Sequence, residues 1–200
     1  MITLIVPVRG EPPEAKQAAL GLAEEGVEVL LAEGEGPRGG RLAAAAEAAR
    51  GDVLLFLHAD TRLPAGWKEL VETAVARGAP GGAFRLGFDG GGARMAVVAF
   101  GANLRTALTR VPYGDQAPFV RRDLYERLGG HRRWPLLEDV DFAVRLKKAG
   151  RVVILRPGVR TSPRRYLEKG IVRTLLLNRW ILFRYHLGAD PEKLAEIYRR

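Results

Sequence analysis

The stretch GDVLLFLHADTRLP, residues 51–64, is an apolar run that ends abruptly in polar side chains. Its apolar part, Val53–His58, has the length and composition of a buried β-strand. Residues two apart on a strand point to the same side, so His58 and Asp60 are expected to share one face if the extended conformation persists. The stretch therefore predicts a central strand that leads directly into a functional site.

Apolar runs of strand length alternate with helical segments through the first 80 residues. The expected strands are 2–8, 27–32 and 53–58, and the expected helices are 14–26, 41–50 and 67–78. This order predicts an α/β fold with a parallel sheet that is covered by helices on both faces. Ligands bind such sheets beyond the carboxyl ends of the strands, which is where His58 and Asp60 are placed.

The alternation is looser after residue 80. The expected elements are strands at 81–88 and 152–155 and helices at 93–110, 138–150 and 167–187. The last of these helices is apolar and carries several arginines. We divide the chain into an α/β domain at 1–160 and a basic, apolar helical tail at 161–200.

The net charge of +9 is concentrated near the carboxyl terminus. Residues 156–200 contain 11 Lys and Arg and 4 Asp and Glu, a net charge of +7, so the other 155 residues carry only +2. Such asymmetry favours an anionic partner, either lipid head groups or nucleic acid. A solvated basic surface has the same composition and is an equal alternative.

The composition also excludes several classes of protein. Cysteine is absent, which excludes disulfides and thiolate metal sites. The sequence has no run of about 18 uncharged apolar residues, so we expect no membrane-spanning helix. The opening MITLIVPV lacks the pattern of a secretory leader, so we expect a cytoplasmic protein.

Four stretches, in this order and at these spacings, resemble the family two glycosyltransferases. They are VPVRGE at 6–11, GDVLLFLHADTRLP at 51–64, YGDQAPFVRRDLYERLGG at 113–130 and LLEDVDFAVRLKKAG at 136–150. The resemblance covers most of residues 1–160, and HADTRLP together with GDQ looks like a bacterial subgroup of short members. It implies a GT-A fold, a largely parallel central sheet, and transfer of a sugar from a nucleotide diphosphate sugar with inversion at the anomeric carbon.

The HAD motif corresponds to the metal-binding Asp-x-Asp motif of the family. Asp60 matches the second acid, which is the more direct ligand of Mn²⁺ or Mg²⁺. His58 stands in place of the first acid and departs from the pattern. A neutral imidazole can ligate Mn²⁺ or bind ribose or phosphate, but it adds no negative charge. The alternative is that Asp60 is a turn residue and His58 a polar group at a strand end.

The resemblance also implies a set of contacts with the donor nucleotide. Pro7, through its backbone, and Glu11 match the end of the first strand, near the nucleobase and ribose. Glu33 occupies a position where the family usually has Asp. Arg41 opens the following helix and could pair with phosphate, although a surface arginine is an equal alternative.

The Glu138-Asp139 pair matches the catalytic base motif of the family. A carboxylate is favoured at the start of a helix, and transfer to a hydroxyl requires a base. Asp139 is the expected base, and Glu138 is expected to orient it or the acceptor. Asp115, Gln116 and Trp134 are expected near the donor sugar or the acceptor. For Asp115 and Gln116 the alternative is an Asx-type turn, and for Trp134 it is packing beneath a loop.

The function predicted from these residues is that of an inverting, metal-assisted glycosyltransferase with an unidentified hydroxyl acceptor. A nucleotidyltransferase is an alternative, although such enzymes typically have a loop rich in glycine and arginine after the first strand. A non-catalytic module that binds nucleotide sugars or an anionic surface is another. We expect no nucleic-acid partner, because the aromatic residues of the tail lie in a heavily apolar helix.

The tail at Leu167–Leu187 has the composition of an interfacial helix. Lys169, Arg173 and Arg184 are expected within roughly 60° of one another, beside apolar residues. Trp180 is of a type that favours the head-group level. We expect peripheral contact with the inner face of a membrane and a lipid-linked acceptor. Packing on the α/β domain or in a homodimer is the alternative.

Overall fold

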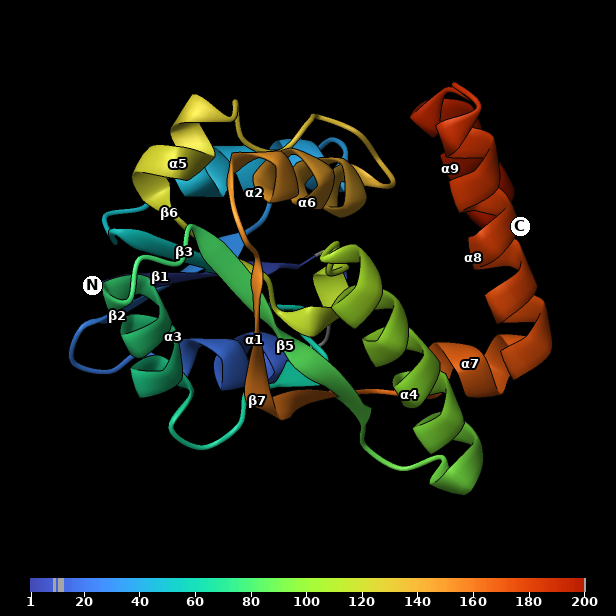
Figure 1. The fold of residues 1–200 in the computed structure, drawn as a ribbon, viewed down its shortest axis with the longest axis horizontal. Helices are drawn as coiled ribbons and strands as arrows, with labels where there is room; N and C mark the ends of the chain where they lie inside the picture. The colour runs from blue at the N-terminus through green and yellow to red at the C-terminus, as the bar shows by residue number, and fades with distance from the viewer. Residues whose placement is uncertain (9, 11–12, 200) are drawn as a thin grey trace.

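The computed structural model describes residues 1–8, 10 and 13–199, and Glu11 therefore lies outside the described residues. Within them a sheet of seven strands has the order β2-β1-β3-β6-β5-β7-β4 (Figure 1). The strands are β1 (Ile2–Pro7), β2 (Val27–Ala32), β3 (Val53–Phe56), β4 (Thr61–Arg62), β5 (Gly81–Phe88), β6 (Phe119–Arg121) and β7 (Val153–Thr161).

Helices cover both faces of this sheet, as the alternating pattern predicts. They are α1 (Pro13–Leu20), α2 (Arg38–Ala48), α3 (Trp67–Ala76), α4 (Gly92–Thr109), α5 (Arg122–Arg127), α6 (Glu138–Ala149), α7 (Arg164–Lys169), α8 (Ile171–His186) and α9 (Pro191–Arg199), with a 3₁₀ turn η1 (Gly114–Gln116). Helices α1, α3 and α4 lie on one face, and α2, α5 and α6 lie on the other (Figure 1).

Strand β1 is buried on both faces, which explains its unbroken apolar sequence. Leu4 and Val6 pack into the core on the α1 and α3 side, while Ile5 packs into the core below α2 and α6. β1 pairs in parallel with β2 on one side and with β3 on the other. The first 60 residues therefore build the parallel half of the sheet that the sequence predicts.

Two strands run against the others. β6 is antiparallel to both β3 and β5, and β4 is antiparallel to β7. β6 has three residues and joins the parallel group β2-β1-β3 to the parallel pair β5-β7. The sheet is thus mostly parallel, with a reversed strand between its two halves.

Several element boundaries differ from the expected ones. α1 ends at Leu20 rather than continuing to residue 26, because Gly21 begins a turn in which Leu22 N–H donates to the carbonyl of Ala19. β7 is longer than expected and continues to Thr161. Neither β4 nor α9 is predicted from the sequence. β4 has only two residues and gives no periodic signal, whereas α9 is amphipathic, with Leu194 and Ala195 buried and its charged residues exposed.

The expected single helix at 167–187 is two helices. α7 ends at Lys169 and α8 begins at Ile171, with Gly170 between them at φ 83°. A left-handed φ suits glycine and interrupts an α-helix. One face of α8 packs through Ile181 and Leu182 against Leu137 and Val140 at the start of α6. None of the described helices combines the length and apolar composition needed to cross a membrane.

Candidate functional site

The order of the first three strands creates a crevice at the carboxyl ends of β1 and β3. The chain leaves β1 through α1 on one face of the sheet and reaches β3 through α2 on the other face (Figure 1). Ligands of open α/β sheets bind at such a change of direction. His58 directly follows this end of β3, after Leu57.

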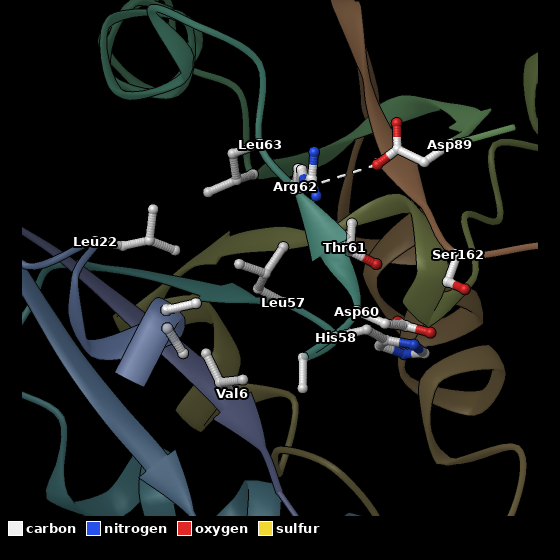
Figure 2. A pocket seen from close by; sticks show the side chains of 13 residues that line it. Val6, Leu22, Leu57, His58, Asp60, Thr61, Arg62, Leu63, Asp89 and Ser162 are labelled. Atoms are coloured by element: carbon white, nitrogen blue, oxygen red, sulfur yellow. Dashed lines mark ion pairs between the residues drawn. The ribbon is translucent and has the colours of Figure 1, made fainter. Parts of the chain in front are cut away.

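A cavity of about 460 Å³ lies beside this crevice. Its floor is apolar and includes Val6, Leu22 and Leu57, and its rim is polar (Figure 2). The polar lining residues are His58, Asp60, Thr61, Arg62, Asp89 and Ser162. Binding sites for small ligands combine an apolar lining with a few polar groups in this way.

Asp60 lies at the rim of the cavity, close to His58 (Figure 2). Its side chain is exposed, and its Oδ1 accepts a long hydrogen bond of 3.4 Å from Thr161 Oγ1. The carboxylate is therefore largely free to take a ligand from the cavity side.

His58 turns its Nε2 atom away from the solvent and toward Arg38. The two side-chain nitrogens are 2.5 Å apart, and because a guanidinium can only donate, Nε2 must accept. Burial, with a smaller effect from Arg38, holds the pKa of His58 well below its usual value. His58 is therefore a neutral imidazole whose Nε2 lone pair already accepts a hydrogen bond from Arg38.

Glu138 and Asp139 begin helix α6, as the sequence predicts. Glu138 is buried and lies 3.2 Å from Arg38 Nη1. Its burial raises the pKa of Glu138 well above its usual value, Arg38 opposes this rise, and Asp139 adds to it. Asp139 is partly exposed and accepts hydrogen bonds from Gly114 N–H at 2.6 Å and from Val140 N–H at 2.8 Å.

These residues meet at Gly114, the first residue of η1. A Cβ atom at this position would lie 2.8 Å from His58 Nε2, 2.9 Å from Asp139 Oδ2 and 3.1 Å from Arg38 Nη2. Only glycine lets the loop approach these three groups so closely. We call Arg38, His58, Gly114, Glu138 and Asp139 the carboxylate cluster.

A second glycine brings helix α2 against the loop before α6. Gly39 N–H donates to the carbonyl of Trp134 at 3.0 Å. A Cβ atom at Gly39 would lie 2.0 Å from the carbonyl oxygen of Arg132. This contact fixes Arg38, the first residue of α2, beside the start of α6.

Asp115 and Gln116 differ in their surroundings, although they are adjacent. Asp115 is half-buried, and burial raises its pKa to about 6, with Arg105 opposing the rise and Asp139 adding to it. Gln116 is fully buried: its Oε1 accepts from Thr106 Oγ1 at 2.8 Å, and its Nε2 donates to the Phe84 carbonyl. Gln116 therefore anchors η1 to the core, and Asp115 is the member of the pair that lies near the cluster.

The other described residues that were expected to contact the donor have different surroundings. Pro7 is the buried last residue of β1. Arg41 is buried, and its Nη1 donates to the carbonyls of Val8 at 2.5 Å and Ala32 at 3.1 Å, so it ties the ends of β1 and β2 together. Glu33 is exposed and pairs with Lys16 at 2.6 Å.

Trp134 is half-buried and packs edge-on against Tyr185 of α8, with ring centroids 6.2 Å apart. Part of the Trp134 ring is therefore covered by α8. A sugar would have to use the part of the ring that remains exposed.

Arg38 and Gly114 are the cluster members that were not identified from the sequence. The sequence pattern points instead to Arg41, three residues further along α2. The signal for Arg38 is Pro37, because proline favours the start of a helix and so places residue 38 at its open end. Gly114 gives no such signal, since its role depends on three residues that are distant in sequence.

No protein-family model and no curated protein matches the chain. Solved structures do match it. A mannosyltransferase, PcManGT from Pyrobaculum calidifontis, in complex with GDP-Man and Mn²⁺, aligns with TM-score 0.56 and 19% identity over 80% of this chain and 56% of that chain. S. aureus TarS 1–349 in complex with UDP-GlcNAc aligns with TM-score 0.51 and 13% identity over 80% of this chain and 58% of that chain.

The chain has a GT-A-type fold. At these identities the similarity extends to the fold alone. The chain spans less than two thirds of the length of these two neighbours.

Proposed function

We propose that the protein transfers a sugar from a nucleotide diphosphate sugar to a hydroxyl acceptor with inversion, as the sequence resemblance to family two implies. The observation that carries this proposal is the position of His58. It lines the cavity on one side and contacts Arg38, another member of the carboxylate cluster, on the other. A donor in the cavity would thus present its sugar to the cluster.

The donor would bind with its nucleoside part in the cavity, whose volume suits a ligand of this size. The phosphates would then lie near Asp60 and Arg38. Arg38 supplies fixed positive charge, and a guanidinium matches phosphate oxygens well. Glu33 and Glu11 remain candidates for base or ribose contacts, while Arg41 and Pro7 shape the strand ends on which the nucleotide rests.

One residue at the cavity, Asp60, suits a divalent cation. No group of three His, Asp or Glu side chains that could hold a metal ion occurs within the described part of the chain. Mg²⁺ in nucleotide sites, however, takes one or two carboxylates and completes its shell with phosphate oxygens and water. Asp60 has the exposed carboxylate for this purpose, whereas the lone pair of His58 is used by Arg38.

A bound Mn²⁺ or Mg²⁺ would supply Lewis-acid stabilisation of the leaving diphosphate. We propose Asp60 as its protein ligand. We propose that His58, rather than ligating the metal, holds Arg38 toward the phosphates.

Asp139 is the proposed base. The acceptor hydroxyl oxygen bonds to the anomeric carbon while its proton passes to the Asp139 carboxylate. The bond from the anomeric carbon to the diphosphate oxygen breaks on the opposite face, and its electron pair leaves with the nucleoside diphosphate. The hydrogen bonds from Gly114 and Val140 fix the carboxylate for this step and leave lone pairs for the acceptor.

Glu138 and Asp115 flank the base on two sides. Glu138 is enclosed and paired with Arg38, so it positions that guanidinium. Asp115 lies on the same loop as Gly114, and we propose it as the group nearest the acceptor or the donor sugar. Trp134 would contribute its exposed edge to the same region.

The test is incubation of the purified protein with a panel of nucleotide diphosphate sugars and Mn²⁺, with detection of released nucleoside diphosphate. Release from one donor, with inverted configuration in the product by NMR, is the expected result. Pyrophosphate release from a nucleoside triphosphate and a sugar phosphate would instead show a nucleotidyltransferase. Binding of a nucleotide sugar without any release would show a non-catalytic module.

A further inference from the structure

Helix α4 exposes an apolar stripe along its whole length. Residues 93, 97, 100, 104 and 108 recur at the spacing of one helix face. The four large members, Val97, Phe100, Leu104 and Leu108, have 49–76% of their surface exposed. Isolated exposed apolar residues are ordinary, but a contiguous row of them marks an interaction surface.

Helix α8 has a stripe of the same kind on the face opposite its packed side. It consists of Val172, Leu176, Trp180, Phe183 and Leu187, the residue that follows the helix, with 42–69% of each exposed. Thr174 and Ile181 point the other way and are buried. Leu167 of α7 is also exposed. We call these exposed residues of α4, α7 and α8 the apolar face.

The two long helices of the apolar face, α4 and α8, carry charges of one sign only. Neither α4 nor α8 contains an Asp or Glu. Arg94 lies at one end of the α4 stripe, and Arg173, Arg179 and Arg184 border the α8 stripe; all four are exposed. Within residues 13–199 no carboxylate lies in ion-pair contact with these four arginines, so their charge is available to a partner.

The two helices belong to one side of the molecule. In Figure 1, α4, α7 and α8 lie together, away from β2 and α3. Their inner residues share one core, in which Met95 and Ala99 of α4 pack with Tyr166 of α7 and Ile171 of α8. The stripes are therefore carried by connected helices rather than by separate parts of the chain.

We propose that the apolar face docks on the surface of an anionic lipid membrane. Exposed apolar stripes edged by arginine, with Trp180 at the boundary, are the features of interfacial helices. A second copy of the chain is a poorer occupant. A two-fold contact would bring the same arginines toward each other with no acid on either helix to neutralise them.

If the proposed function holds, the docked orientation also has a consequence for the acceptor. The inner face of α8 contacts Trp134, and Arg105 of α4 binds Gln116 of η1. Helices about 10 Å in diameter thus separate the lipid surface from the carboxylate cluster. An acceptor hydroxyl carried on a lipid would reach the cluster from that surface.

The test is flotation of the full chain with vesicles of phosphatidylcholine alone or of phosphatidylcholine and phosphatidylglycerol, at low and high salt and without nucleotide sugar. Binding to the anionic vesicles at low salt and its weakening at high salt are the expected results. A variant with Arg173, Arg179 and Arg184 all changed to Gln should have a partition coefficient for anionic vesicles about 100-fold lower than that of the original chain. The charge-matched control, with exposed Arg77, Lys147 and Lys148 changed to Gln, should keep most of the binding.

A second variant tests the apolar part. The triple variant Phe100→Ser, Leu108→Ser and Phe183→Ser should no longer float with the vesicles. Its melting temperature should be unchanged, because these side chains are exposed. The control is Leu20→Ser, at an exposed leucine outside the apolar face. Equal binding to neutral vesicles, or no binding to either, would overturn the proposal. So would a lipid-free dimer that the serine variant converts to a monomer, since the face would then join two copies.

These readouts need no turnover, so they fail or succeed independently of the glycosyltransferase proposal. The acceptor is tested by adding a donor with a labelled sugar to vesicles made with a total lipid extract. Label in the lipid phase supports a lipid-linked acceptor. Flotation without label in lipid retains the docking surface and overturns that acceptor.

Discussion

The carboxylate cluster and the cavity meet at His58, yet they are held in different ways. In the cluster, Arg38, Glu138 and Asp139 are fixed by short contacts to one another and to Gly114. At the cavity rim, Asp60 is exposed, and the described part of the chain gives its carboxylate one long hydrogen bond, from Thr161. The cluster is thus preorganised by the protein itself, whereas the rim is a surface that a ligand would complete.

This difference indicates how substitutions should act on each side. A change in the cluster should alter the rate of transfer, because its groups are already in place for the chemical step. A change at the rim should alter the affinity for the donor, because the Asp60 carboxylate is exposed and its hydrogen bond from Thr161 is long.

The largest effect is expected from Asp139→Asn. Removal of the base should lower the rate of transfer by about 10²–10⁴ and leave donor affinity within a few-fold. Turnover with a confirmed acceptor and calorimetry with the donor measure the two quantities. Near-normal turnover would move the role of base to Asp115 and weaken the distinction between the two sides.

The next effect is expected from Gly114→Ala. The added Cβ would press on His58, Arg38 and Asp139, whose side-chain ends can shift, so folding should survive. A displacement of this kind can cost about 10² in rate. Thermal unfolding and turnover should separate a small loss of stability from a large loss of rate. Unchanged turnover would show that the close approach at Gly114 is unrelated to catalysis.

A smaller effect, on affinity, is expected from Asp60→Asn. Loss of one charged ligand should weaken Mn²⁺-dependent donor binding roughly tenfold to a hundredfold. Calorimetry with and without Mn²⁺ measures the difference. The control is Glu126→Gln, which changes an exposed acid of α5 on the opposite face of the sheet from the cavity. An equal loss in the absence of metal would assign Asp60 to the nucleotide rather than to the ion.

The smallest effect concerns Asp115 and pH. Its pKa of about 6 in the folded protein exceeds that of an exposed aspartate, so the folded state binds the extra proton and this group favours folding as pH falls from about 6 toward 4. Asp115→Asn should therefore stabilise the protein more at pH 8 than at pH 4, by about 1–2 kcal/mol. Denaturant unfolding of both proteins at the two pH values measures this, and a pH-independent difference would contradict the raised pKa.

Periodicity and local signals predicted much of the fold. The apolar runs located β1, β2 and β3, and the acidic start of α6 located Glu138 and Asp139 at one helix end. These features depend on neighbours within a few residues. The membership of Arg38 in the cluster depends on the packing of α2 against the loop before α6, which no local pattern encodes.

In the tail, too, local sequence patterns do not predict features that depend on tertiary packing. Its composition predicted an amphipathic helix, but the basic stripe was expected to include Lys169. Gly170 places Lys169 on α7, and Arg179 instead borders the α8 stripe with Arg173 and Arg184. The matching stripe on α4 could not be recognised as part of the same surface, because only the folded chain brings α4 beside α7 and α8.

The contacts of Arg38 have a consequence for kinetics. Its guanidinium now serves His58 and Glu138, and in the proposed complex it would also serve the donor phosphates. If the acceptor bound before the donor, it would lie beside Asp139 while the Arg38 guanidinium still pointed toward His58 and Glu138. The two substrates would then add in a compulsory order, donor before acceptor, and the nucleoside diphosphate would leave last as a competitive inhibitor of the donor alone.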